Sequence, residues 1–233
     1  MDTKKSKLFF NWSSGKDSSF ALYELLQQNR FEISTLLTTV GMETERIGMH
    51  GLRESLLRRQ VEAIGIPLEI IYLSSSASHE AYNKLMGDAM VKMKRRGIYD
   101  TAFGDIFLED LRAYRESQLE KVGIKAHFPL WKRDTKELIL EFIELGFKTK
   151  IVAASATFFD EDFVGQDVTK DLINSLPKGV DPCGENGEFH TFCYDGPNFK
   201  YPVTFELGEK VKKSYPNPGL KGNKIDFWFC DLI

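Results

Sequence analysis

Short apolar runs alternate with helical patterns through the first two thirds of the chain. Apolar and β-branched residues gather into runs that predict five buried strands, at residues 8–12, 33–40, 68–73, 101–103 and 126–128. Between these runs, apolar residues recur every three or four positions, as do Leu57, Val61 and Ile64, which is typical of one face of a helix. Strands that alternate with helices predict right-handed βαβ units and a parallel sheet with helices on both faces. The pattern therefore indicates a Rossmann-like α/β fold, in which ligands bind at the carboxyl ends of the strands.

The alternation changes after residue 132. Asp134 and Glu137 stand at D-x-x-E spacing, a capping box that predicts the start of a helix running through Leu145. Beyond this helix the pattern predicts three strands, at residues 151–154, 203–207 and 225–229. A Gly- and Pro-rich stretch at residues 177–198 lies between the first and the second of them. We therefore predict a larger N-terminal domain (1–132) and a smaller α+β C-terminal domain (133–233).

Composition narrows the class of protein. The chain has 31 Lys and Arg against 34 Asp and Glu, and this net charge of −3 counts against a nucleic-acid binder. No apolar run approaches the ~18 residues of a membrane span, so we expect no membrane partner. The three cysteines, Cys183, Cys193 and Cys230, are too far apart for a zinc pattern or a disulfide framework. These features predict a reduced, cytoplasmic protein.

A small, polar segment follows the first predicted strand and precedes the first helix. It reads Ser13-Ser14-Gly15-Lys16-Asp17-Ser18. Small residues allow a ligand to approach the backbone, the helix N-terminus offers N–H groups, and Lys16 adds a positive charge, which together predict a phosphate cradle. The spacing is not that of a Walker A loop, and a carboxylate beside phosphate makes Asp17 a candidate magnesium ligand. The structural alternative is an ordinary helix N-cap.

A second polar cluster occupies residues 181–191. It offers carboxylates, an amide, an imidazole and a hydroxyl within a few positions, together with glycines that suit an irregular loop. Glu188 and His190 are two residues apart, so on an extended segment they would point to the same side and could act as a general base or hold an ammonium-like nucleophile. The structural alternative is a solvated loop with one locally bonded histidine.

Both clusters resemble the motifs of known families. The loop at 13–18 resembles the SGGKDS pyrophosphate loop of the N-type ATP pyrophosphatases, although Ser14 stands where that pattern has glycine. The segment at 184–191, with the Asp-Gly-Pro that begins at Asp195, resembles the C-terminal signature of the diphthine–ammonia ligase (diphthamide synthase) family. Three further matches occur in the same order, at His50-Gly51, Gly104-Asp105-Ile106 and Pro129-Leu130-Trp131.

The resemblance implies an ATP-dependent ligase. Members of this family adenylate a carboxylate, release AMP and pyrophosphate, and form an amide with free ammonia. The implied cofactors are ATP and Mg²⁺, and the implied partners are ammonium and a carboxylate acceptor, which is the diphthine of elongation factor 2 in organisms that make it. The fold that it implies is that of the adenine nucleotide alpha-hydrolases, with ATP bound by domain 1–132 and the acceptor by domain 133–233.

The resemblance also assigns residues to roles. The nucleotide would contact Ser13, Ser14, Gly15, Lys16, Asp17, Ser18 and Gly104. Magnesium would be held by Asp17 and Asp105. The substrate side would be formed by Glu185, Asn186, Glu188, His190 and Thr191. The catalytic groups would be Lys16, Asp105, Glu188 and His190.

Other functions stay open. The chain could be a pyrophosphatase that acts on another carboxylate or on tRNA, although no C-x-x-C pair of the sulfur-inserting enzymes is present. It could also be an ATP-binding sensor without chemistry, a reading that the polar loop at 183–191 disfavours. A glutamine-fed amidotransferase would need a glutaminase unit, for which no stretch is long enough. Nothing in the sequence decides the oligomeric state, and a homo-oligomer is compatible with it.

Overall fold

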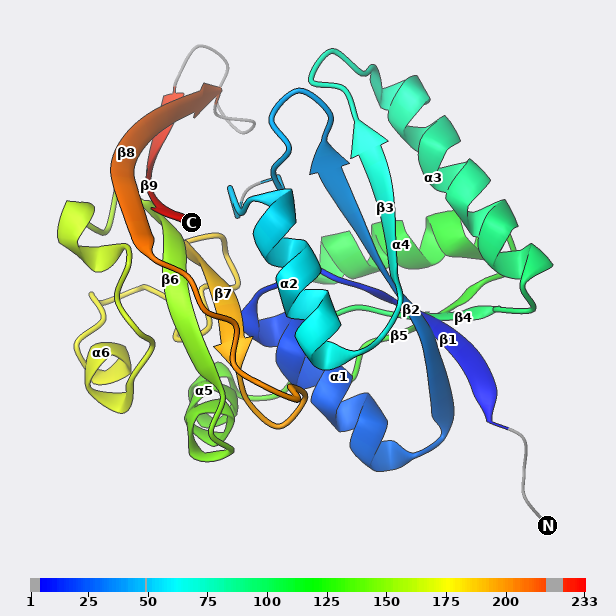
Figure 1. Cartoon of the computed structure of the whole chain (residues 1–233), viewed down its shortest axis with the longest axis horizontal. Coiled ribbons are helices and arrows are strands. Elements are labelled where there is room, and N and C mark those ends of the chain that lie inside the picture. The colour runs from blue at the N-terminus through cyan, green and yellow to red at the C-terminus, as the bar shows by residue number, and fades with distance from the viewer. Residues whose placement is uncertain (1–4, 49, 217–223) are drawn as a thin grey trace.

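Two β-sheets stand side by side in the computed structural model, which describes residues 5–48, 50–216 and 224–233 (Figure 1). The first sheet is parallel throughout and has the strand order β3-β2-β1-β4-β5. Its strands are β1 (Ser6–Asn11), β2 (Phe31–Gly41), β3 (Leu68–Leu73), β4 (Asp100–Ala102) and β5 (Lys125–His127). The predicted α/β fold is therefore confirmed, and the order reverses beside β1, which is where such sheets bind ligands.

Helices cover both faces of the parallel sheet, as predicted. The four helices are α1 (Lys16–Gln28), α2 (Glu54–Ile64), α3 (His79–Arg95) and α4 (Glu109–Lys121). One apolar cluster joins α1 and α2 to the sheet face that carries Leu8 and Phe10. A second cluster joins α3 and α4 to the opposite face, which carries Phe9 and Leu37. Successive strand residues thus serve opposite faces, which explains why β1 is apolar along its length.

The second sheet is antiparallel, with the order β7-β6-β9-β8. Its strands are β6 (Lys148–Ser155), β7 (Phe189–Asp195), β8 (Leu207–Pro216) and β9 (Lys224–Leu232), and it is accompanied by α5 (Thr135–Glu144), the 3₁₀-helix η1 (Glu161–Phe163) and α6 (Lys170–Asn174). The capping box is confirmed, because the Asp134 carboxylate accepts the Glu137 N–H at 2.9 Å.

Two strand predictions were wrong in this part. Strand β7 was not foreseen because its polar residues, His190 and Thr191, interrupt the apolar pattern. Strand β8 begins at Leu207 instead of ending there, since Val203 and Phe205 pack into the core without strand pairing. Its alternating lysines mark it as an edge strand, which apolar patterning does not detect.

Both sheets contribute to one apolar core. Phe20 on α1 lies 6.0 Å from Phe142 on α5 and 6.2 Å from Phe147, measured between ring centroids. The division at residues 132 and 133 stays a prediction, and the packing across it is continuous.

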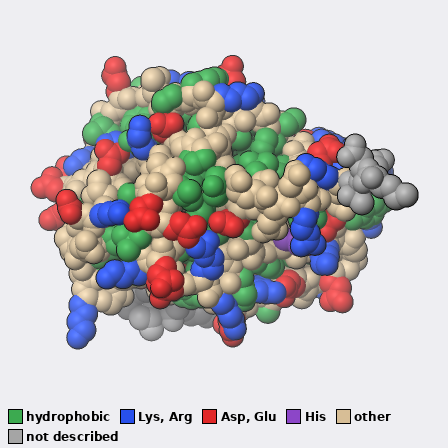
Figure 2. Space-filling model, turned by 90° about the horizontal axis from the view of Figure 1, so that it is seen from below, with side chains coloured by type: hydrophobic (Ala, Val, Ile, Leu, Met, Phe, Trp, Pro, Cys, Tyr) green, Lys and Arg blue, Asp and Glu red, His purple; other side chains and the backbone are tan. Residues whose placement is uncertain are grey.

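The surface carries charges of both signs, as the nearly equal numbers of acidic and basic residues predict. On the face that Figure 2 shows, acidic and basic side chains of the described residues are interspersed. None of the described helices is long and apolar enough to cross a membrane.

Candidate active site

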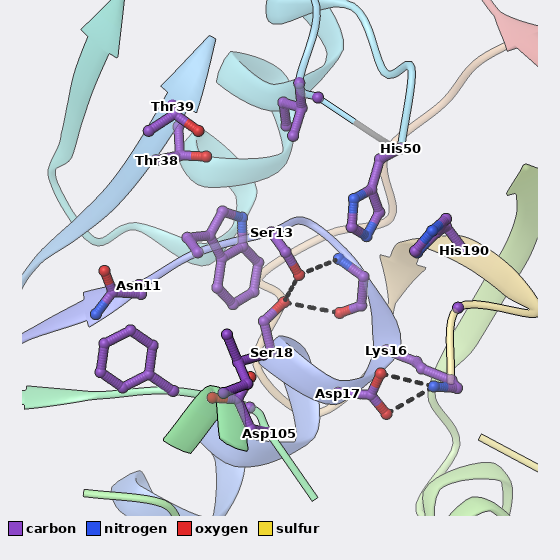
Figure 3. A pocket seen from close by; sticks show the side chains of 18 of the residues that line it. Asn11, Ser13, Lys16, Asp17, Ser18, Thr38, Thr39, His50, Asp105 and His190 are labelled. Atoms are coloured by element: carbon purple, nitrogen blue, oxygen red, sulfur yellow. Dashed lines mark hydrogen bonds and ion pairs between the residues drawn. The ribbon is translucent and has the colours of Figure 1, made fainter. Parts of the chain in front are cut away.

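A cavity of about 450 Å³ lies at the carboxyl ends of the parallel strands, between the two sheets (Figure 3). Three segments far apart in sequence line it, namely the loop 13–18, Gly104-Asp105 after β4, and the segment 184–191 that leads into β7. Of the predicted site residues, those that line it are Ser13, Gly15, Lys16, Asp17, Ser18, Gly104, Asp105, Glu185, His190 and Thr191. Ser14, Asn186 and Glu188 do not line the cavity.

The loop 13–18 turns directly into α1. Gly15 occupies the N-cap with φ −87° and ψ 179° and, having no side chain, makes no capping hydrogen bond of its own. A Cβ at Gly15 would lie 3.2 Å from both His50 Nε2 and the Thr191 carbonyl oxygen, so a side chain here would require these neighbours to move by a few tenths of an ångström. Ser13 Oγ lies 3.1 Å from Ser18 Oγ across the loop. The first turn of α1 therefore lies at the cavity wall, where the helix dipole adds a partial positive charge.

Ser14 contributes its backbone to this loop. Its φ is +70°, in the left-handed region that favours glycine, and its buried Oγ has no hydrogen-bond partner among the described residues. Its carbonyl oxygen accepts the Cys193 N–H at 2.9 Å and Gln60 Nε2 at 3.0 Å. The loop is thereby bound to the outer edge of β7.

Gln60 completes this attachment, and the sequence analysis did not foresee its role. Its fully buried amide also donates to the Cys193 carbonyl oxygen at 2.6 Å and accepts from Trp12 Nε1 at 2.9 Å. The available signal was a polar residue on the apolar face of α2, beside Leu57 and Val61. One side chain thus connects Trp12, directly after β1, with the loop 13–18 and β7.

Lys16 and Asp17 form an ion pair inside the cavity. Lys16 Nζ lies 2.6 Å and 2.7 Å from the two carboxylate oxygens of Asp17, as Figure 3 shows. Burial opposes charge on Lys16, but the Asp17 carboxylate holds the pKa of Lys16 above its usual range, so the ammonium persists. The Lys16 backbone N–H donates to Thr191 Oγ1 at 3.0 Å, which joins the first turn of α1 to β7.

Gly104 and Asp105 follow β4 and lie against α1. A Cβ at Gly104 would come within 2.9 Å of the Asp17 carbonyl carbon and the Ser18 nitrogen, so only glycine fits. Asp105 Oδ2 lies 2.9 Å from Arg115 Nε, a cavity residue on α4 that the sequence analysis missed. Burial raises the pKa of Asp105, although Arg115 opposes the shift.

Glu185 joins two of the motifs. Its Oε1 accepts the Ile106 N–H at 2.7 Å, so the segment at 184–191 is fixed to the loop after β4. Burial raises the pKa of Glu185 to about 7, while the Ile106 hydrogen bond opposes the shift. A carboxyl that titrates near neutral pH can accept or donate a proton under physiological conditions.

Glu188 does not share a side with His190, contrary to the sequence-based expectation. Its buried Oε1 accepts the Asp181 N–H and Asn186 Nδ2, both at 3.0 Å, and so closes the loop on itself. The reason is that Glu188 lies in the turn before β7, where the strand's alternation does not apply. Asn186 is exposed. Both residues therefore support the loop and do not face the cavity.

Two histidines meet at the cavity wall. The ring centroids of His50 and His190 lie 4.9 Å apart at an interplanar angle of 44°. Burial and the charge of Lys16 lower both pKa values, that of His190 to about 4 and that of His50 well below its usual range, with His190 adding to the shift of His50. Both imidazoles are neutral at pH 7. His50 was noted as part of a motif but not as a cavity residue.

The remaining cavity residues carried no recognisable motif. Those on or next to strand ends and on helices include Asn11, Thr38, Thr39, Tyr82, Met86 and Phe103. Their positions follow from the topology, because β1, β2 and β4 end at the same edge of the sheet.

The carboxylates suit a magnesium ion held together with phosphates. Asp17 and Asp105 are close enough for the charge of Asp17 to raise the pKa of Asp105. Among the residues that the structure describes, no three His, Cys, Asp or Glu side chains form a metal-binding group. Magnesium commonly takes one or two protein carboxylates and completes its shell with phosphate oxygens and water. The two carboxylates fit that arrangement.

Fold and cavity together define the class. The chain has the features of a PP-loop protein, named after the pyrophosphate loop. It has a parallel sheet, a Ser-Gly-Lys-Asp-Ser turn between the first strand and helix, and a second sheet that closes the cavity. Two family models match the chain, the diphthamide synthase N-terminal domain over residues 6–126 and the diphthamide synthase C-terminal domain over residues 134–218. The chain belongs to the diphthamide synthase family, which is a family of enzymes.

Individual relatives agree with this assignment. A diphthine–ammonia ligase of Mus musculus is 25% identical over 78% of this chain and 69% of its own length. That of Homo sapiens is 28% identical over 64% of this chain and 62% of its own length, so the chain spans about two thirds of these relatives. Among solved structures, the U34-tRNA thiolase NcsA from Methanococcus maripaludis with its [4Fe-4S] cluster shares 17% identity, with a TM-score of 0.37 over 62% of this chain and 59% of that one. A TM-score this low is no indication of shared function.

Proposed function

We propose that this chain is an ATP-dependent ligase that adenylates a carboxylate and transfers ammonia to it, releasing AMP and pyrophosphate. The carrying observation is that family motifs distant in sequence converge on one cavity and bond to one another. The Lys16 N–H donates to Thr191 Oγ1 at 3.0 Å, and the Ile106 N–H donates to Glu185 Oε1 at 2.7 Å. The name of the relatives, diphthine–ammonia ligase, supports the reaction type.

The loop 13–18 would bind the phosphates that leave as pyrophosphate. The N-terminus of α1, the Ser13 and Ser18 hydroxyls and the Lys16 ammonium all lie at the cavity wall. Negative charge grows on the leaving pyrophosphate as the bond between the α- and β-phosphates breaks. Donors already in place there stabilise that charge without reorganisation. Gly104 keeps the opposite wall close to this turn.

Asp17 and Asp105 would hold magnesium together with the phosphates. When bound, the ion would neutralise phosphate charge and orient the polyphosphate for attack by the carboxylate. The ion pairs with Lys16 and Arg115 fix both carboxylates at the cavity wall.

The acceptor and ammonia would enter from the side of β7. Glu185, His190 and Thr191 line the cavity there, whereas Glu188 and Asn186 shape the loop that carries them. Ammonia must lose a proton as it forms the amide, and a Glu185 carboxylate with a pKa of about 7 is suited to accept it. The relatives' name points to diphthine, carried by elongation factor 2, as the acceptor.

Nucleotide product analysis tests the proposal. The protein is incubated with ATP, magnesium, ammonium chloride and elongation factor 2 that carries diphthine. We expect AMP, pyrophosphate and amide in equal amounts, and loss of all three in Lys16→Gln. Lys170→Gln is the matched control, because Lys170 pairs with Glu144 at the surface. Formation of ADP and phosphate would rule out the proposed reaction.

A further inference from the structure

Two histidines from distant segments form one wall of the cavity. His50 lies in the loop between β2 and α2, and His190 lies in β7. Their rings face the same space as the loop 13–18 (Figure 3). Neither imidazole has a hydrogen-bond partner among the described residues, and their one described contact is with each other. Their nitrogen atoms are therefore available to a ligand.

The His50 imidazole lies beside the first turn of α1, and the His190 imidazole lies next to that of His50. The position of a Gly15 Cβ is 3.2 Å from His50 Nε2 and 3.2 Å from the carbonyl oxygen of Thr191, the neighbour of His190. This is the part of the loop where the helix N-terminus and Lys16 attract anions. A phosphate chain on the loop would extend past the imidazoles.

The loop that carries His50 is fixed from the second sheet. Arg46 Nη1 donates to the Gly51 carbonyl oxygen at 2.6 Å and pairs with Asp231 on β9 at 2.8 Å. Arg53 pairs with the same carboxylate. Gly51 has φ +64°, which disfavours a residue with a side chain, and a Cβ there would lie 3.0 Å from the Phe229 ring. His50 is thus positioned in advance.

A bound anion would add negative charge beside the two imidazoles. Lys16 and Asp17 line the cavity from α1, and Glu185 lines it from the loop before β7. The positive charge of Lys16 lowers the pKa of both imidazoles. Without a ligand, burial and Lys16 keep both rings uncharged. A polyphosphate brings several negative charges, which favour the protonated form of each nearby imidazole.

We propose that His50 and His190 bind the terminal phosphates of the nucleotide as imidazolium groups, so that polyphosphate binding takes up protons from solution. This inference rests on the proposed nucleotide site and adds two ligands and a proton linkage to it. Charge-assisted hydrogen bonds to phosphate are stronger than neutral ones, so the affinity rises as the pH falls. Pyrophosphate would bind more tightly at pH 6 than at pH 8, and its release would be easier as the pH rises.

Calorimetry with pyrophosphate in EDTA tests this linkage without metal or acceptor. Titrations at pH 6.5 in buffers of different ionisation enthalpy give the number of protons taken up. We expect proton uptake by the wild type and less uptake by His50→Gln/His190→Gln, with a dissociation constant at least ~10-fold weaker, which corresponds to the loss of one charge-assisted bond. His127→Gln is the control, since His127 bonds to Asp100 at 2.7 Å and does not line the cavity.

The outcomes separate this inference from the proposed function. If the wild type binds neither pyrophosphate nor ATP, the proposed nucleotide site is wrong and this inference falls with it. If pyrophosphate binds with equal proton uptake in both proteins, only the histidine linkage is overturned. NMR of histidine-labelled wild type is a second test, independent of how the variant folds. An upward shift of both imidazole pKa values on pyrophosphate binding supports the linkage, and unchanged values overturn it.

Discussion

Ser14 carries a cost that a glycine at the same position would not. Its φ of +70° is disfavoured for a residue with a Cβ, and its buried hydroxyl lacks a partner among the described residues. The resemblance to the pyrophosphate loop identifies the position as one where the family pattern has glycine. The structure explains that preference in physical terms and shows that the loop keeps its backbone path despite the serine, through Cys193 and Gln60.

Ser14→Gly is expected to stabilise the protein. Removing the strain and the unpartnered hydroxyl outweighs the added freedom of the unfolded chain, for a gain of about 1 kcal/mol. In a domain of this size, that raises the melting temperature by ~2–4 °C. Ser13→Gly is the matched control, because Ser13 is not among the residues with positive φ, and it should lower the melting temperature. A Ser14→Gly protein with a lower melting temperature than the wild type would show that Ser14 is not strained in the folded protein.

Glu185 makes stability depend on pH. Its pKa is about 7 in the folded protein against an ordinary 4.5, so the folded state binds more protons than the unfolded state between these values. Stability contributed by protonated Glu185 is therefore present below pH 4.5 and is lost as the pH rises to 7. The drop in melting temperature from pH 5 to pH 8 should be smaller in Glu185→Gln, whereas Glu120→Gln, at an exposed site on α4, should keep the wild-type drop. Equal drops in all three proteins would refute the assignment.

At the scale of elements, the cavity depends on how β7 is attached. Strand β7 is an edge strand of the second sheet, and its outer N–H and C=O groups pair with the loop 13–18 and with Gln60. The outer edge of the antiparallel sheet thus binds the loop 13–18, which follows the central strand of the parallel sheet. The capping box at Asp134 could be predicted because it is local, whereas β7 could not, since its polar residues serve a cavity that only tertiary packing creates.

Gln60→Leu tests this attachment. The leucine fits the space but leaves Trp12 Nε1 and the Cys193 carbonyl oxygen without their partner, at a cost of about 2–4 kcal/mol. We expect a melting temperature lower by ~5–10 °C and weaker pyrophosphate binding in calorimetry. Glu62→Leu, at an exposed position of the same helix, should change neither by a comparable amount. A Gln60→Leu protein with wild-type stability would show that the buried amide is dispensable.

At the scale of the whole molecule, the two sheets act as one unit. Phe20 of α1 packs against Phe142 and Phe147, so neither sheet buries its apolar surface without the other. Differential scanning calorimetry should therefore show a single transition whose calorimetric and van't Hoff enthalpies agree. Two separated transitions would mean that the predicted division at residue 132 also divides the folding.

The sequence predicted the parallel sheet for physical reasons, and it predicted part of the cavity lining, with Gly104 and Asp105 found only through the family resemblance. Apolar runs define buried strands, topology brings their ends together, and the short motifs at 13–18, 104–106 and 184–191 mark the loops that follow. The side-chain contacts within the cavity could not be predicted from the sequence. Nothing in the spacing indicates that Arg115 pairs with Asp105, that His50 meets His190, or that Glu188 closes its own loop.

A crystal structure of the protein with ATP and magnesium would show directly whether the loop 13–18 binds the nucleotide phosphates. We expect the β- and γ-phosphates to lie against the backbone of residues 13–18, at the start of α1, with the ion between them and Asp17 or Asp105. ATP bound in another place, or phosphates that point away from that turn, would contradict it.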